Sequence, residues 1–120
     1  MAEHNQTGKK GEELAAGMLK DKGYEILEKN WRYKNVEADI IAQKGDMLVI
    51  VEVKTRRTTF FGEPEEFVNK AKKQNLVKAA NAYIEQHKLD FEVRFDIISV
   101  VISGGKTMVH HIEDAFYPTS

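Results

Sequence analysis

The feature that most constrains this chain is a set of charged residues that meets two apolar runs. The runs span residues 40–42 and 48–51. Two carboxylates precede the first run, and a carboxylate and an ammonium group follow the second: Glu37, Asp39, Glu52 and Lys54. A charge at the end of a buried strand is costly unless a partner charge, hydrogen bonds, a metal ion or solvent compensates it. These four residues therefore need a structural explanation.

A turn signal separates the two runs, so residues 37–54 are predicted to form an antiparallel hairpin. A loop of two or four residues (Lys44-Gly45, or residues 43–46) sets Glu37 opposite Glu52 and Asp39 opposite Ile50. All four charges then share one face, with Asp39 diagonal to Glu52. A loop of odd length, or a bulge, would move Asp39 to the other face.

Three carboxylates on one face repel one another and raise one another's pKa unless a cation lies between them. Because the chain has no Cys and no His at ligand spacing, the hard oxygen ligands favour Mg²⁺ or Mn²⁺ over Zn²⁺. Lys54 would orient a water or stabilise charge on a phosphate. The alternative is a solvated hairpin face on which Glu52 and Lys54 merely pair.

Composition limits the remaining choices. With 120 residues, of which 42% are hydrophobic and 31% charged, we expect a single domain over residues 1–120. There is no apolar run of transmembrane length, and residues 1–10 are polar, so we expect a cytoplasmic protein without a membrane partner. The absence of Cys excludes disulfides and thiolate metal sites.

The charge distribution is more informative than the net charge of −1. Residues 54–78 contain seven basic and three acidic residues, a local net charge of +4. A basic segment beside carboxylates suits a phosphodiester substrate, although a solvated helix face has the same composition. Residues 55–64 mix basic, hydroxyl and aromatic groups that would either follow a nucleic-acid backbone or, through Phe60 and Phe61, fill the core.

Hydrophobic periodicity predicts the other elements. We expect helices over residues 9–22 and from 65–70 to about 87, the second with Asn69 as N-cap, and strands over residues 24–33, 92–102 and 108–112. Glu12 lies on the apolar side of the first helix, either as a partner of the helix dipole or as a fourth acid at the site. Lys72 begins the inward stripe of the second helix.

Asp96 interrupts the fourth strand. It either supports the site or forms a structural hydrogen bond with Arg94, two residues away. His110 and His111 are adjacent on a strand, so they face opposite ways and we assign them no catalytic role.

At this point the chain resembles a known group. The shared motifs are Gly11-Glu12, Asn30-Trp31-Arg32, Glu37-x-Asp39, Val51-Glu52-Val53-Lys54-x-Arg56, Phe61-Gly62-x-Pro64, Arg94-Phe95-Asp96 and Ala115-Phe116. It resembles the YraN-like family of uncharacterised bacterial proteins in the PD-(D/E)XK, restriction-endonuclease-like superfamily, which is similar to archaeal Holliday junction resolvases. The resemblance covers roughly residues 8–116. Val36 and Ala38 depart from the usual pattern, whereas every acidic position is kept.

The resemblance implies a three-layer α/β/α fold around a central mixed sheet of about five strands. It also implies Asp39 and Glu52 as metal ligands, Lys54 as the catalytic lysine, and Glu12 and Glu37 as accessory acids.

We therefore expect a Mg²⁺- or Mn²⁺-dependent nuclease that hydrolyses DNA phosphodiesters, with branched DNA as one candidate substrate. Arg56, Arg57 and Lys72 would contact phosphates. A homodimer would present two sites to a branched duplex. The alternatives are a noncatalytic nucleic-acid-binding module of the same fold and a protein-interaction domain with structural carboxylates.

Overall fold

The computed structural model describes residues 2–57 and 69–118. The predicted roles of Phe60 and Phe61, and the Phe61-Gly62-x-Pro64 motif, lie outside these residues. Within them the chain forms, in order, α1 (Ala2–Asp21), β1 (Glu25–Tyr33), β2 (Val36–Lys44), β3 (Met47–Arg56), α2 (Lys70–His87), β4 (Glu92–Ser103) and β5 (Lys106–Phe116). Every predicted element is present, and α1 begins earlier than expected, at Ala2.

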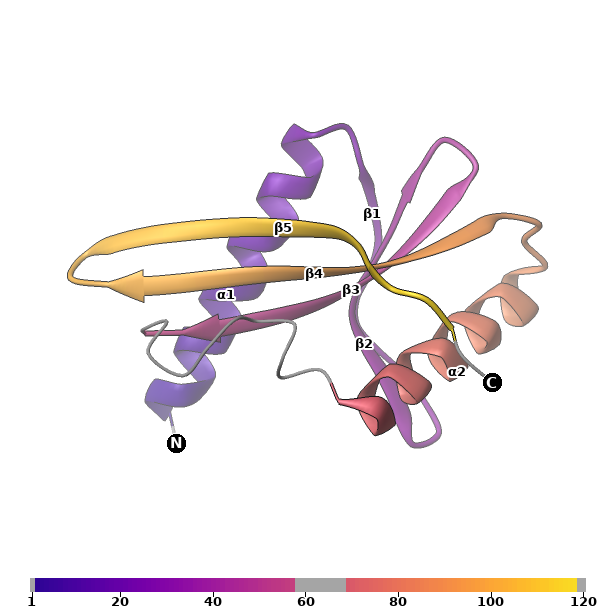
Figure 1. The fold of residues 1–120 in the computed structure, drawn as a ribbon, viewed down its shortest axis with the longest axis horizontal. Coiled ribbons are helices and arrows are strands. Elements are labelled where there is room, and N and C mark those ends of the chain that lie inside the picture. Colours follow the sequence, from indigo (N-terminus) through magenta and orange to yellow (C-terminus); the bar gives the residue numbers. More distant parts are fainter. Residues whose placement is uncertain (1, 58–68, 119–120) are drawn as a thin grey trace.

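The five strands form one mixed sheet in the order β1-β2-β3-β4-β5. Only the β3–β4 pair is parallel, because α2 carries the chain back between these two strands. The helices pack on opposite faces of the sheet, which gives three layers (Figure 1). The predicted fold class, α/β/α around a mixed sheet of five strands, is confirmed.

Each helix buries one apolar stripe against the sheet. Ala15, Ala16 and Leu19 of α1 pack on Ile40, Ala42, Val49, Val51, Ile98 and Val100. Leu76, Ala79, Ala80 and Tyr83 of α2 pack on the other face, against Val36, Ala38, Ile41, Leu48, Ile50, Phe95 and Ile97. The predicted N-cap of α2 is confirmed, since the Asn69 side chain accepts a hydrogen bond of 2.9 Å from the backbone N–H of Lys72.

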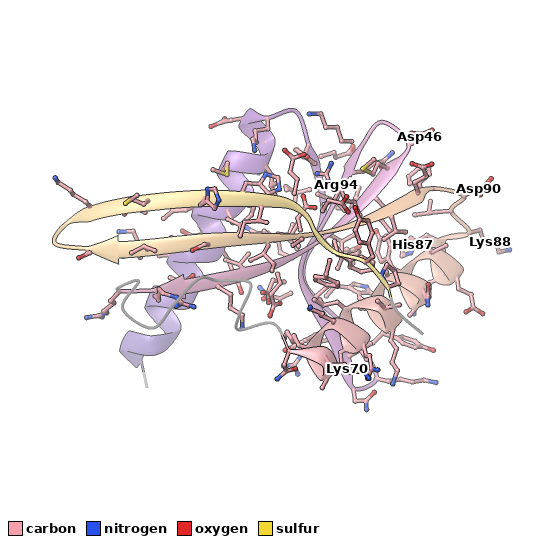
Figure 2. All side chains as sticks on the ribbon, in the orientation of Figure 1. Asp46, Lys70, His87, Lys88, Asp90 and Arg94 are labelled. Carbon is pink, nitrogen blue, oxygen red and sulfur yellow. The ribbon has the colours of Figure 1, made fainter. Side chains whose placement is uncertain are left out.

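Two close contacts join α1 and the start of β4 to the hairpin of β2 and β3. Gly11 lies so close to β3 that a Cβ atom there would be 1.8 Å from the Thr55 Oγ1 atom. At the other end of the molecule, the backbone N–H of Glu92 donates to the carbonyl of Asp46 at 3.3 Å. Figure 2 shows Asp46 and Asp90 at this shared end, where the β2–β3 turn lies beside the connection from α2 to β4.

The predicted register of the β2–β3 hairpin was wrong by two residues. Ile41, not Asp39, pairs with Ile50, because the two-residue loop is Gly45-Asp46. Gly45 has a φ of 62°, and a hairpin turn with glycine in this conformation at its first loop position matches the twist of the strands. A shift of two residues preserves the facing of each side chain, so Asp39 moves closer to Glu52 instead of to the other face.

The strands β2 and β3 separate beyond the pair Ile40–Val51. From there β2 continues beside β1, with Trp31 paired to Ala38, while β3 continues beside β4, with Glu52 paired to Ile97. Figure 1 shows the two strands diverging. We call this point the β2–β3 fork; its first residues are Asp39 on β2 and Glu52 on β3.

Side-chain alternation in β2 also breaks at Asp39. Ala38 packs on the α2 side and Ile40 on the α1 side, although regular alternation would place both on one face. The β1 residue between the neighbouring pairs is Asn30, whose φ of 52° is left-handed. Asparagine tolerates this conformation better than most residues. The local break places Asp39 between the two layers, at the opening of the fork.

Candidate active site at the β2–β3 fork

Asp39 is tied to β3 by a single backbone hydrogen bond. Its Oδ2 atom accepts from the N–H of Val53 at 2.8 Å. Because the β2–β3 ladder has ended one residue earlier, the carboxylate takes the place of the backbone acceptor that a continuing strand would provide. The fork therefore fixes the position of Asp39 beside Glu52.

Glu52 is a buried carboxylate with one well-occupied oxygen and one orphaned oxygen. The residue is 2% exposed. Its Oε2 atom lies 3.2 Å from the Lys72 Nζ atom and 3.6 Å from the Lys54 Nζ atom. Among the described residues, its Oε1 atom has no hydrogen-bond partner. A buried oxygen in this state is costly, so Oε1 is the atom at this site that most needs a ligand.

The electrostatics of the two acids are coupled. Burial, and next the negative charge of Glu52, raise the pKa of Asp39 to about 8; a side-chain hydrogen bond with Glu52 and the charge of Glu12 add to the effect. The hydrogen bond from Val53 opposes this change. At neutral pH, Asp39 is therefore largely protonated unless a cation compensates the second negative charge. Partial burial disfavours the charged form of Lys72, but the charges of Glu52, Asp39 and Glu37 outweigh it and raise the Lys72 pKa.

The two predicted accessory acids lie at the edge of this pair. Glu12 of α1 accepts a hydrogen bond of 3.0 Å from the Asn30 side chain. The prediction that Glu37 lies opposite Glu52 was wrong. Glu37 pairs with Arg32 of β1, whose Nε atom donates to the Glu37 carboxylate at 2.9 Å. The Glu37 side chain is 49% exposed. Both acids act on the fork through their charge, Glu12 on Asp39 and Glu37 on Lys72.

The predicted phosphate-binding residues are brought only partly together. Lys72 reaches the carboxylate pair, as just described, and also lines a cavity of about 290 Å³ together with Arg32, Lys34 and Asn75. Arg56 is half-buried at the end of β3, and Arg57 follows it, exposed; both make interactions within the chain. Basic groups therefore approach the fork from β1, β3 and α2.

The donor set suits a divalent ion held by two carboxylates. Within residues 2–57 and 69–118, no group of three or more His, Asp or Glu side chains is arranged to hold a metal. A cage made only of protein ligands is therefore not present in this part of the chain. Mg²⁺ typically takes one or two carboxylates and completes its shell with water and substrate phosphate. Asp39 and the orphaned Oε1 atom of Glu52 match this requirement.

Asp96 belongs to a separate network on the α1 side of the sheet. Arg94 donates to both of its oxygens, at 2.9 and 2.8 Å, and the His111 Nε2 atom lies 2.6 Å from Oδ2. The backbone N–H of Asp114 donates to Oδ1 at 2.9 Å, where β5 bulges between Ile112 and Phe116. Of the two roles considered for Asp96, the structure shows the hydrogen bond with Arg94.

Sequence reasoning missed two contacts at the fork. The ion pair between Lys72 and Glu52 was not foreseen, although the position of Lys72 on the inward stripe of α2 was the available signal. The bond from Asn30 to Glu12 was also missed, and no periodicity in the sequence indicates it. Both depend on the packing of a helix against a strand distant in sequence.

Fold and site together define a class: a three-layer α/β/α domain with a mixed five-stranded sheet, compatible with the restriction-endonuclease-like fold, and with acids and lysines gathered at one strand fork. In the described part of the chain, no helix is long and apolar enough to cross a bilayer.

Comparison with known proteins identifies the family. The model described as "Uncharacterised protein family UPF0102" matches residues 11–100. The chain is 55% identical over 117 residues to a UPF0102 protein of Christiangramia forsetii and 53% identical over 121 residues to one of Flavobacterium johnsoniae. A UPF0102 protein of Bacteroides thetaiotaomicron is 49% identical over 118 residues. Each match covers 98% of both chains. The protein belongs to the UPF0102 family, the YraN-like group that its motifs indicated.

Proposed function

We propose that this protein is a Mg²⁺- or Mn²⁺-dependent nuclease that hydrolyses DNA phosphodiesters. The observation that carries the proposal is the state of Glu52, a buried carboxylate with two lysines on one oxygen and, among the described residues, no hydrogen-bond partner for the other. A purely structural ion pair would satisfy both oxygens. The orphaned oxygen beside Asp39 is instead suited to a ligand that arrives from outside the chain.

Each residue at the fork has a distinct task in this proposal. Asp39 and Glu52 would hold the metal ion, which when bound supplies a more acidic water and neutralises charge on the phosphate. Lys54 lies 3.6 Å from Glu52, where its ammonium group can hold the attacking water or stabilise charge that develops on the phosphate. Lys72 keeps the Oε2 atom of Glu52 occupied, so that Oε1 stays directed to the ligand.

The surroundings suit a phosphodiester substrate. Glu12 and Glu37 add negative charge around the fork, which favours a divalent cation there. Arg56, Arg57 and Lys72 would contact the phosphates on either side of the cleaved bond, giving salt-dependent binding with little base specificity. If the substrate is branched DNA, a symmetric dimer would present one site to each of two strands.

A cleavage assay tests the proposal directly. The purified protein is incubated with linear duplex, single-stranded and four-way branched DNA, with Mn²⁺ or with EDTA. We expect cleavage that requires the metal and that Glu52→Gln abolishes, while Glu85→Gln, on the exposed surface of α2, retains it. Cleavage by Glu52→Gln at the rate of the unmodified protein would refute the assignment of the site.

Metal binding is a second, independent measurement. Titration of the unmodified protein with Mn²⁺, followed by electron paramagnetic resonance, is expected to show binding that Glu52→Gln weakens. The alternative function, a noncatalytic nucleic-acid-binding module, is favoured by one observation, that the described residues contain no cluster of three metal-binding side chains. Metal-independent binding of DNA without cleavage would support that alternative.

A further inference from the structure

A basic groove lies on the flank of α2 that faces away from the carboxylate pair. It has a volume of about 600 Å³, and its lining includes Lys70, Lys73, Gln74, Lys78 and Tyr117. Figure 1 shows the chain descending from the end of β5 along α2, and Figure 2 shows Lys70 at the start of that helix. We call this feature the lysine groove. Among the described residues that line it, none is acidic.

Two lysines of this groove, Lys70 and Lys73, lie in the first turn of α2, where a helix ordinarily prefers acids. The first turn of α2 carries lysines and no acidic residue, although the positive end of the helix dipole favours negative side chains there. A local arrangement that opposes helix stability points to a functional reason, and an external anion would relieve the repulsion.

The shape of the groove adds to the argument from charge. The ammonium group of Lys73 lies 5.5 Å from the centre of the Phe116 ring, which holds it at the groove. Tyr117 is 69% exposed, and its hydroxyl donates to Asp114 at 2.7 Å. The ring of Tyr117 is thus anchored at one end and presents an aromatic surface to solvent, as a platform for base stacking requires.

The groove and the fork are neighbours on one helical turn. Lys72 and Lys73 are consecutive in α2, about 100° apart around the helix axis. Lys72 contacts Glu52, while Lys73 lines the groove. A chain of phosphates that leaves the fork past Lys72 therefore meets Lys73 next.

We infer that the lysine groove binds the sugar-phosphate backbone of a single nucleic-acid strand that flanks the phosphate held at the fork. The exposed ring of Tyr117 favours a single strand over a duplex, because only unpaired bases are free to stack on it. Three lysines would contact phosphates and Tyr117 would stack on an unpaired base. This inference depends on the proposed function only in taking nucleic acid as the substrate; it does not require cleavage.

Binding measured in EDTA tests the groove without any hydrolysis. Fluorescence anisotropy of a labelled single-stranded oligonucleotide is recorded over a range of salt concentrations for the unmodified protein and for K70A/K73A/K78A. We expect the triple variant to bind at least tenfold more weakly at low salt. The slope of log K against log salt should fall by about 2, since each contact with a single strand contributes about 0.7.

A charge-matched variant controls for the loss of three positive charges. K20A/K29A/K106A removes three exposed lysines outside the groove and should keep the salt slope of the unmodified protein. If the groove variant does not fold, K70A and K78A, which alter exposed side chains, should each lower the slope by about 0.7. An unchanged slope in the groove variants, or an equal loss in the control, would overturn the inference.

Variants of Tyr117 test whether the bound nucleic acid is a single strand or a duplex. Tyr117→Ala should weaken binding of the single strand about fivefold or more and leave binding of a linear duplex unchanged, because duplex bases are already stacked on each other. Tyr117→Phe keeps the ring and should bind like the unmodified protein. Equal losses on both substrates would overturn the assignment to an unpaired strand.

Two outcomes distinguish this inference from the proposed function. If the protein binds single strands through the groove but never cleaves them, the inference about the groove is supported and the proposed nuclease activity is refuted. Poly-glutamate and unlabelled DNA are compared as competitors at equal concentrations of negative charge. If poly-glutamate displaces the oligonucleotide as well as DNA does, the groove binds an acidic protein partner and its assignment to nucleic acid is overturned.

Discussion

Two aspartates of the same sheet, the buried Asp96 and the half-buried Asp39, show opposite electrostatic states. Asp96 has its charge fully compensated: burial opposes ionisation, but hydrogen bonds from His111, Arg94 and the Asp114 backbone outweigh it and lower the Asp96 pKa. Asp39 accepts a hydrogen bond from the N–H of Val53, but burial, the charge of Glu52 and a side-chain hydrogen bond with Glu52 raise its pKa to about 8. Hydrogen-bond donors compensate the charge of Asp96, whereas the side chain beside Asp39 is a second carboxylate.

The difference separates a structural acid from a candidate functional one. The Arg94 guanidinium binds both oxygens of Asp96 and also contacts Glu113 at 3.2 Å and the Tyr24 hydroxyl. Fully satisfied networks of this kind hold strands in place. A half-buried acid whose pKa is raised by desolvation and by a neighbouring carboxylate is typical of sites that bind cations or perform chemistry.

The first prediction tests whether the network around Asp96 stabilises the fold. Asp96→Ala removes the buried carboxylate that Arg94 binds through two nitrogens and frees the bulge of β5 at Asp114. We expect the free energy of unfolding to fall by about 3–5 kcal/mol, the cost of breaking a buried ion pair. Urea denaturation measures it. A loss below about 1 kcal/mol would show that the network contributes little to stability.

The second prediction tests whether Asp39 is required for cleavage. Asp39→Asn keeps an oxygen for the Val53 N–H and removes the ionisable group. Cleavage is expected to fall roughly 100-fold or more, the scale for losing one group that stabilises transition-state charge. The free energy of unfolding above pH 8, measured in EDTA, should be equal to or higher than that of the unmodified protein. A variant that is less stable there, or that cleaves normally, would contradict the comparison.

The third prediction uses the pH dependence of stability, whose sign differs for the two acids. The raised pKa of Asp39 means that the folded protein holds a proton that the unfolded chain has lost, so stability falls as the pH rises from about 4 to about 8. The slope is at most about 1.4 kcal/mol per pH unit. The stabilisation from Asp96, whose pKa is lowered, is present above the ordinary pKa and lost as the pH falls below it.

Urea denaturation in EDTA from pH 4 to pH 9 measures these slopes. Asp39→Asn should flatten the decline between pH 4 and pH 8 relative to the unmodified protein. If the two curves are parallel over this range, the Asp39 pKa is not raised in the folded protein.

The last prediction concerns Glu12, whose charge contributes to the raised pKa of Asp39. Gly11→Ala places a Cβ atom against Thr55, displacing the turn of α1 that carries Glu12, and we expect a loss of about 1–3 kcal/mol. Gly17→Ala, in the same helix with nothing within 4 Å, is the control and should gain about 0.5–1 kcal/mol. Thermal unfolding compares the two. Equal stability of both variants would show that α1 adjusts freely at β3.

Much of the fold was predictable because the responsible interactions are local. Asn69 was identified as the N-cap of α2 from its position before a helical pattern, and the paired acids at the strand ends were visible as charges beside apolar runs. The register error shows the limit. In the predicted two-residue loop Gly45 came second, whereas in the structure it comes first with a left-handed φ, and a shift of two residues changes which side chains face each other.

The helices and strands could be predicted from the amino-acid sequence because alternation, helical periodicity and capping act within a few residues. The three-layer fold followed from the resemblance of the motifs to the YraN-like family. Only the tertiary structure decided how the acids are compensated. The divergence of β2 from β3 isolates Asp39, the packing of α2 brings Lys72 to Glu52, and the pairing of β5 with β4 brings His111 to Asp96. A carboxylate's charge state depends on burial and on partners distant in sequence, and folding alone brings those partners together.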